Sequence, residues 1–140
     1  MIVNSYFIIL FSFFMPSANA TLELEISEFR NTKGHVLVSV FDNADDFPDS
    51  EKNAVANKKL KVTAKKHTVI FESLPHGEYA VVFLHDENGN EEMDTNFVGA
   101  PTEGYGASND AVNTFSAPKY QDAKFILDGT QKSMKLKIFY

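Results

Sequence analysis

Alternating hydrophobic and polar positions recur along most of this chain and predict β-strands. In residues 21–29, "TLELEISEF", the apolar side chains of Leu22, Leu24 and Ile26 share one face and acidic or polar side chains share the other. The same two-residue period, bounded by turn-forming residues, predicts six more strands, at residues 35–41, 59–64, 68–73, 78–84, 123–127 and 133–139.

Seven short strands of this kind predict an all-β domain. The expected fold is an antiparallel β-sandwich of immunoglobulin-like or transthyretin-like kind, and the alternative is a small closed barrel. One segment, "FPDSEKNAVANK" from Phe47, has a helix-like pattern, so we expect at most a short helix there, capped by Asp49 or Ser50. Asp128 and Gly129 predict a hairpin turn before the last strand.

Two of the predicted strands, 35–41 and 78–84, are apolar on nearly all of both faces. A sandwich strand normally turns one face to water, so the outer face of these strands needs a cover. The segment 86–121 has no strong periodicity, and a loop of that length is rare in a compact domain unless it is ordered. We therefore expect it to lie back on the sheet through its large apolar side chains, namely Phe97, Val98, Tyr105, Phe115 and Tyr120.

Residues 1–20 have the pattern of a secretory signal peptide. An apolar run at 6–15 precedes the small-x-small motif Ala18-Asn19-Ala20, which predicts cleavage before Thr21. The alternative, a membrane anchor, is disfavoured because about ten apolar residues are too short for a bilayer that needs about 20. We expect one β-sandwich domain at 21–140, without a transmembrane segment, in the periplasm or secreted.

The cysteine content and the net charge of the chain exclude some classes of ligand and partner. The chain has 140 residues, no cysteine and a net charge of −6. The lack of cysteine excludes disulfides and thiolate metal sites. An acidic chain lacks the basic surface that nucleic acids require, so we expect no nucleic-acid partner, and we expect a monomer.

The stretch "HDENGNEEMDT" at residues 85–95 concentrates acidic and amide side chains in one turn. Oxygen-bearing residues stand at alternate positions, a spacing that suits calcium, at Asp86, Asn88, Asn90, Glu92 and Asp94. Two positions depart from a helix–loop–helix calcium loop: Glu91 stands where Gly is usual, and Phe97 where a bidentate Glu is usual. The alternative is an exposed Asn-Gly turn with solvated acids. Calcium is the one cofactor that this sequence suggests.

The segment "GAPTEGYGASNDA" at 99–111 is rich in glycine and small polar residues, which often line binding sites. Its candidate ligand or contact residues are Glu103, Tyr105, Ser108 and Asn109. The alternative is that these side chains bond their own backbone. The four histidines lack metal-ligand spacing and no G-x-S-x-G motif occurs, so we predict no catalytic residue.

Three stretches, "LPHGEYAVVFLHDENGN", "MDTNFVGAPTEGYGASNDA" and "APKYQDAKF", resemble the bacterial exported proteins grouped as domain of unknown function 2141. The resemblance implies an exported single domain of sandwich type and no particular activity. That family commonly has Gly where this chain has Glu91, a departure that bears on calcium binding.

The expected function is that of a non-enzymatic exported protein whose acidic loop binds calcium and supports an interaction surface for a protein or glycan in the cell envelope. The alternative is a small-molecule or glycan-binding module that uses the 99–111 loop. A hydrolase with acids from both loops is the weaker third hypothesis.

Overall fold

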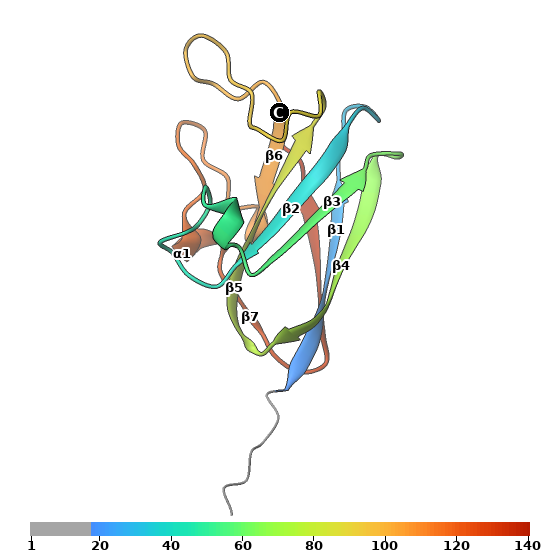
Figure 1. Ribbon diagram of the computed structural model, residues 1–140, viewed down its shortest axis with the longest axis vertical. Coiled ribbons are helices and arrows are strands. Elements are labelled where there is room, and N and C mark those ends of the chain that lie inside the picture. The colour runs from blue at the N-terminus through green and yellow to red at the C-terminus, as the bar shows by residue number, and fades with distance from the viewer. Residues whose placement is uncertain (1–17) are drawn as a thin grey trace, which may run out of the picture.

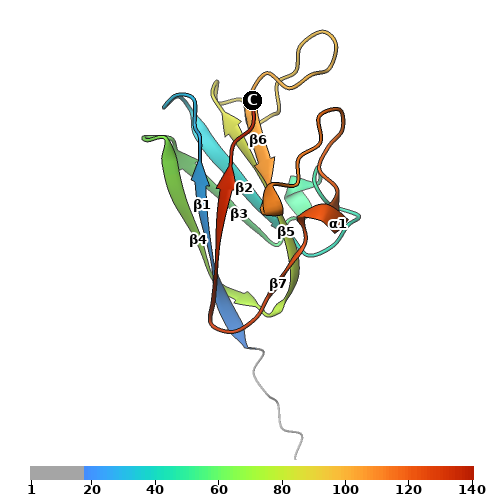
Figure 2. The same ribbon diagram turned by 180° about the vertical axis from the view of Figure 1, so that it is seen from behind.

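The computed structural model describes residues 18–140, which form two β-sheets packed face to face (Figures 1 and 2). The smaller sheet has the strand order β4-β1-β8. β1 pairs antiparallel with β4 and parallel with β8. The bounds are β1 Asn19–Ser27, β4 Lys66–Pro75 and β8 Gln131–Lys137.

The larger sheet has the order β3-β2-β5-β6, and β7 also pairs with β5. All of its pairs are antiparallel. β6 and β7 share one edge of the long strand β5, with β6 along residues 82–85 and β7 along residues 77–79. The bounds are β2 His35–Phe41, β3 Ala56–Lys61, β5 Gly77–Asp86, β6 Gly104–Ala107 and β7 Phe125–Leu127.

The main core lies between the two sheets and follows directly from the alternating pattern. In β1 every second residue is buried, so Leu22, Leu24 and Ile26 face the larger sheet. In β5 the residues Tyr79, Val81 and Phe83 face the same core. Burial of these aliphatic and aromatic side chains is the main source of stability for a domain without disulfides.

The predicted all-β sandwich is confirmed, with two sheets rather than one closed barrel. The strand predicted at 59–64 lies at 56–61 and so begins inside the segment with the helix-like pattern. Three further details differ from expectation. An additional strand, β6, lies inside the segment predicted to be aperiodic, because Gly104 and Gly106 remove the hydrophobic alternation that reveals a strand. The β1–β8 pair is parallel, so the smaller sheet is mixed. The predicted hairpin at Asp128-Gly129 is wrong, because this turn connects β7 and β8, which belong to different sheets.

In the described part of the chain, helical structure is confined to single turns. The segment after Phe47 contains only a 3₁₀ turn, η1 (Glu51–Asn53), and Ser50 makes no side-chain capping bond. A second 3₁₀ turn, η2 (Ser108–Asp110), and a one-turn helix, α1 (Tyr120–Ala123), follow β6. Within residues 18–140, no helix has the length and apolar character needed to cross a membrane.

The predicted signal peptide lies almost wholly outside the described residues. Its last residues, Asn19 and Ala20, begin β1 and pair with the end of β4. The parallel ladder with β8 begins only at Thr21, and a bulge separates Ala20 from Leu22 in the pairing with β4. The predicted cleavage point therefore coincides with the start of the regular ladder.

Candidate functional site: a groove on the outer face of the larger sheet

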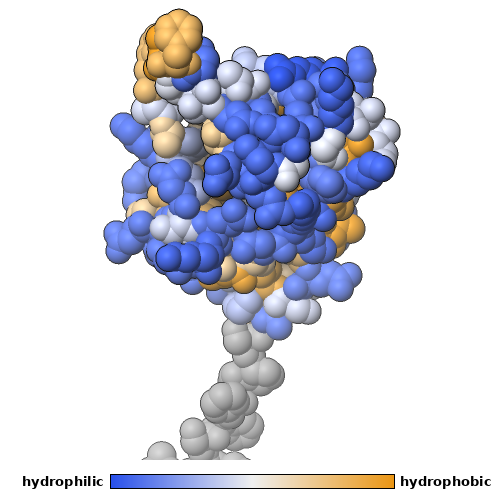
Figure 3. Space-filling model, turned by 45° about the horizontal axis from the view of Figure 1, so that its top comes forward, coloured by the Kyte–Doolittle hydropathy of each residue, from blue (hydrophilic) through white to orange (hydrophobic). Residues whose placement is uncertain are grey.

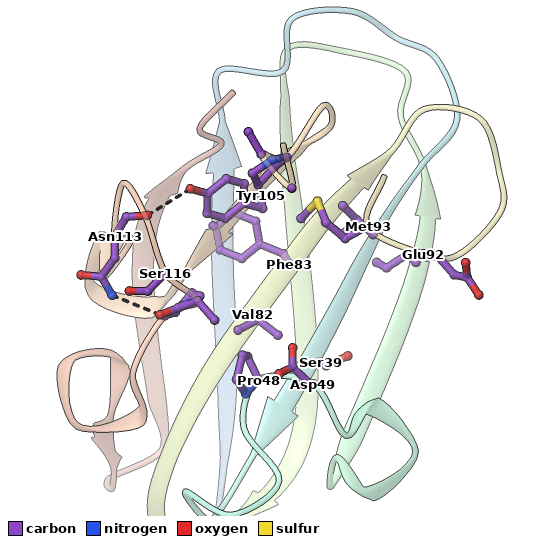
Figure 4. A pocket seen from close by; sticks show the side chains of 18 of the residues that line it. Ser39, Pro48, Asp49, Val82, Phe83, Glu92, Met93, Tyr105, Asn113 and Ser116 are labelled. Carbon is purple, nitrogen blue, oxygen red and sulfur yellow. Dashed lines mark hydrogen bonds between the residues drawn. The ribbon is translucent and has the colours of Figure 1, made fainter. Parts of the chain in front are cut away.

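The outer face of the larger sheet carries an open groove of about 840 Å³ (Figure 4). Its floor consists of residues on β2, β5 and β6 that point away from the main core. They form two rows of register partners, Leu37–Leu84–Tyr105 and Ser39–Val82. Most of this floor is apolar, and Ser39 and Tyr105 each add a hydroxyl group to it.

Three loops form the walls of the groove. The first wall is the loop from β5 to β6, which contributes Glu91, Glu92, Met93 and residues 98–101. The second wall is the 113–118 loop, in which Tyr105 Oη donates to the Asn113 carbonyl and Asn113 Nδ2 donates to the Ala117 carbonyl (Figure 4). The third, at the lower end, consists of Pro48, Asp49 and Glu51. Each wall thus comes from a different part of the chain.

A second, smaller core closes the lower end of this face. Phe47 and Tyr120 pack over Phe41 and Ala80, with ring centroids of Phe47 and Tyr120 5.7 Å apart. The segment 86–121 therefore covers the sheet only in part. Tyr120 is buried as predicted, while Tyr105 belongs to the sheet itself.

The expectation that Phe97, Val98 and Phe115 lie on the sheet is wrong. Phe97 is 100% exposed and Phe115 is 98% exposed, at the tips of the two flanking loops. For Phe97 and Val98 the physical reason is local: Asn96 Oδ1 accepts the backbone N–H groups of Val98 and Ala100, which folds this tip into a tight turn. Figure 3 shows a hydrophobic projection of this kind beside a mostly hydrophilic face.

The acidic loop at the upper end is organised by a buried carboxylate. Asp86 is fully buried, and its two oxygens accept the N–H groups of Gly89 at 2.9 Å and Glu91 at 3.0 Å. Glu91 has a φ of +62°, a left-handed conformation that favours glycine. Glu91 therefore stands in strained backbone at the position where the calcium-loop pattern expects glycine.

The other candidate calcium ligands gather in the same turn. Asn88 and Asn90 each accept a backbone N–H with the side-chain oxygen and each turn the amide Nδ2 toward Asp94. Glu92 is exposed and lies at the edge of the groove. Within residues 18–140, no group of three His, Cys, Asp or Glu side chains is placed to hold a metal ion. An ion here would need the amide oxygens and backbone carbonyls as well.

The turn between β1 and β2 fixes the base of the acidic loop. Arg30 Nε donates to Glu87 Oε1 at 2.8 Å, Asn31 Nδ2 donates to Glu87 Oε2 at 2.8 Å, and Arg30 also donates to the Thr102 carbonyl. Burial alone would raise the pKa of Glu87, but the bonds from Asn31 and Arg30 and the Arg30 charge outweigh it, so the pKa lies below its ordinary value.

A buried histidine joins this turn to the end of the chain. His85 Nε2 lies 2.8 Å from the Lys33 carbonyl, and because a carbonyl only accepts, this nitrogen carries the proton. His85 Nδ1 then accepts from Tyr140 Oη at 2.7 Å, while Tyr140 Oη accepts the Arg30 N–H. Burial is the main cause of the raised pKa of the Tyr140 hydroxyl. These contacts are structural and lie away from the groove.

The residues expected in the 99–111 loop are placed in three different surroundings. Tyr105 lines the groove. Glu103 is buried beneath the acidic loop and accepts the N–H groups of Glu87 and Asp94. Ser108 accepts the Val81 N–H and donates to the Ala123 carbonyl, filling the gap between β6 and β7, and Asn109 donates to the Asp122 and Lys124 carbonyls.

Negative charge is present on two of the three walls of the groove. Its lining includes the carboxylates Asp49, Glu51, Glu91 and Glu92, and no Lys, Arg or His is among the described residues that line it. Glu91 forms an ion pair with Lys59, which lowers the pKa of Glu91 through the hydrogen bond and the charge of that ammonium group.

The floor of the groove was missed by the sequence reasoning, which named only Tyr105 among its residues. The feature of the sequence that indicates this floor is the second apolar face of the strands 35–41 and 78–84. We interpreted that face as a surface that the segment 86–121 covers. Leu37, Val82 and Leu84 belong to that face.

Comparison with known proteins gives one match. No curated protein and no solved structure matches the chain. A family profile described as an uncharacterized protein conserved in bacteria matches residues 24–135, which run from β1 to β8 and include the acidic loop and the groove. Because this match spans most of the chain, the protein belongs to the DUF2141 family.

Proposed function

We propose that this protein is an exported, non-enzymatic binding protein whose outer groove holds a small amphipathic ligand. The observation that carries the proposal is the groove of about 840 Å³ over an apolar floor at the centre of the larger sheet. Ligand pockets of this size, lined mainly by apolar groups with a few polar ones, are typical of small-molecule sites.

The side chains around the groove support binding rather than catalysis. The two buried carboxylates of residues 18–140, Asp86 and Glu103, are engaged by backbone N–H groups and do not face the groove. His85 is likewise held between a backbone carbonyl and Tyr140. A general acid or base must reach a substrate proton, and these groups are already committed to the fold.

A neutral amphiphile tests the proposal. Octyl glucoside, added below its micelle concentration, should give saturable shifts of the Val82 and Leu84 methyl signals in NMR spectra, while Leu24 and Ile26 in the main core stay unchanged. Ser116→Trp places a large ring on the exposed 113–118 wall and should weaken binding severalfold. The matched control is Ser133→Trp on an exposed position of β8, which should bind like the parent. Absence of shifts at Val82 and Leu84 would contradict the proposal.

A second function, calcium binding by the acidic loop, is favoured by a specific feature of the turn. Asn88 and Asn90 both donate an amide N–H to the Asp94 carboxylate, so positive charge is favourable at this position. A calcium ion between Asp86, Asn88, Asn90 and Asp94 would supply positive charge there and would find oxygen ligands at the spacing of a calcium loop. Its affinity would be modest, because Glu91 occupies the glycine position.

Thermal unfolding with calcium and with EDTA tests this second function. Ligands that bind only the folded state raise the melting temperature, so calcium should raise it and EDTA should lower it. Native mass spectrometry should show one bound calcium in the parent and none in Asp94→Asn. Equal melting temperatures in both buffers would contradict calcium binding and would leave the proposed ligand site in the groove unaffected.

A further inference from the structure

We infer that the ligand of the groove is a small amphiphile with a cationic end, of the alkylammonium or arylammonium class. This inference rests on the proposed function of the groove and names the chemistry of its ligand. It follows from the charge of the walls, the apolar floor and the pairing of the strands beneath it.

The charge of the lining selects for a cation. Two walls carry carboxylates, Asp49 and Glu51 at the lower end and Glu91 and Glu92 on the acidic loop, and the described lining offers no basic side chain to oppose them. Lys59 neutralises Glu91, and the other carboxylates of the lining, Asp49, Glu51 and Glu92, form no ion pair within residues 18–140. A groove lined by one sign of charge raises the local concentration of the opposite charge and disfavours anions.

The apolar floor requires the rest of the ligand to be hydrophobic. Leu37, Val82 and Leu84 present aliphatic surface, and Tyr105 adds an aromatic ring next to the 113–118 wall. Burial of apolar surface would supply most of the affinity. The exposed carboxylates would then set the preference among head groups.

The strand pairing favours a small molecule over an extended peptide. A peptide that adds to a sheet needs an open strand edge. In the floor, β2 lies between β3 and β5, and β5 lies between β2 and β6. The remaining edge of β6 is closed by Tyr105 and Phe139, which exchange two backbone hydrogen bonds of 2.9 Å. The open edge of this sheet belongs to β3, which contributes no residue to the lining of the groove.

Three octyl compounds that differ only in the head group test the inference. Octyltrimethylammonium, octyl glucoside and octyl sulfate are titrated in EDTA-containing buffer, and binding is followed by calorimetry and by the methyl signals of Val82 and Leu84. The ammonium compound should bind roughly threefold to tenfold tighter than the glucoside, as expected for a few exposed ion pairs, and the sulfate should bind most weakly. Added salt should reduce the ammonium preference and leave glucoside binding unchanged.

A matched pair of variants locates the preference. Neutralising the rim with Asp49→Asn, Glu51→Gln and Glu92→Gln together should remove the preference for ammonium while glucoside affinity is retained. The control neutralises three carboxylates outside the groove, Glu23→Gln, Glu72→Gln and Asp128→Asn, with the same change in net charge. It should keep the preference.

Each outcome decides one proposal. Glucoside binding as tight as ammonium binding, or tighter sulfate binding, would overturn the cationic ligand class and leave the groove as a binding site. Loss of the preference in the control variant as well would assign it to overall charge and also overturn the inference. Failure of octyl glucoside to shift the groove signals would overturn the proposed function itself.

Discussion

Asp86 binds the backbone of Glu91 from a fully buried position, with its Oδ2 3.0 Å from the Glu91 nitrogen. The same carboxylate also holds Gly89, so a single side chain fixes the first half of the acidic loop. The loop in turn forms one wall of the groove, because Glu92 and Met93 follow directly. The wall therefore depends on a carboxylate that does not itself touch the groove.

Asp86→Ala should loosen this wall while the two sheets remain folded. Two charge-assisted hydrogen bonds are lost, and two backbone donors are left without partners, which costs about 2–3 kcal/mol in the free energy of unfolding. Amide hydrogen exchange at residues 87–95 should accelerate, and exchange in β1 should not. Asp128→Ala, in the exposed β7–β8 turn, is the control and should change stability by less than about 0.5 kcal/mol. Unchanged exchange at 87–95 would show that other contacts order the loop.

Glu91→Gly should raise the melting temperature relative to Glu91→Gln. Both substitutions remove the ion pair with Lys59, but only glycine also relieves the left-handed φ of +62°. The expected difference between the two variants is roughly 4 °C, measured by calorimetry. Calcium, if bound, should bind more tightly to the glycine variant. Equal melting temperatures would mean that the backbone at this position is not strained.

Glu87→Gln should destabilise the protein at neutral pH and have little effect in acid. The folded-state pKa of Glu87 lies below its ordinary value of 4.5, so the charged form stabilises the fold above that value. This stability is lost as the pH falls from 4.5 through the lowered pKa of the folded state. Because Arg30 is 45% exposed, the difference at pH 7 should be about 0.5–1 kcal/mol.

Urea unfolding of Glu87→Gln and the parent from pH 7 to pH 3 measures this dependence. Glu72→Gln, an exposed position on β4, is the control and should follow the parent throughout. A constant difference between Glu87→Gln and the parent at every pH would exclude the ion pair as its cause.

Gly34→Ala should be far more disruptive than Gly129→Ala. The two glycines have nearly the same φ, +63° and +65°, so both substitutions carry the same backbone penalty of about 1 kcal/mol. A Cβ at position 34 would lie 1.9 Å from the Asp86 carbonyl oxygen, whereas a Cβ at 129 meets nothing within 4 Å. Chemical unfolding should show a loss of more than about 2 kcal/mol for Gly34→Ala alone. Similar losses in both variants would show that the turn can move away from Asp86.

The proposed export, with cleavage of the signal peptide, should leave a protein that begins at Thr21. Its intact mass, measured from a periplasmic fraction or from the medium, should correspond to residues 21–140. Cleavage there removes the two pairs with β4 that precede the bulge, the hydrogen bond from the His76 N–H to the Ala18 carbonyl and the buried side chain of Ala20. The ladder between β1 and β8, which begins at Thr21, stays complete. A mass that includes residues 1–20 would contradict cleavage.

The sequence by itself determined the strands and the main core. A two-residue period is a local property, so the strands at 19–27, 35–41 and 77–86 were recognised from the sequence as 21–29, 35–41 and 78–84. The inward face could be assigned for the first of them, whereas the other two are apolar on nearly all of both faces. The same local logic placed Asp86, Asn88 and Asn90 in one turn. The strand β6 was not recognised, because two of its four residues are glycines and their lack of a side chain leaves no alternation of apolar and polar positions.

Only the tertiary structure decided what happens on the outer face of the larger sheet. The pattern showed that Leu37, Val82 and Leu84 need partners, but whether a loop covers them depends on how two distant loops leave the sheet. Asn96 turns the first loop tip outward through bonds to its own backbone, and Tyr105 holds the second through the Asn113 carbonyl. A groove thus remains where the pattern predicted a covered surface. Its walls come from residues far apart in sequence, and the contacts that hold them cannot be inferred from a local hydrophobic pattern.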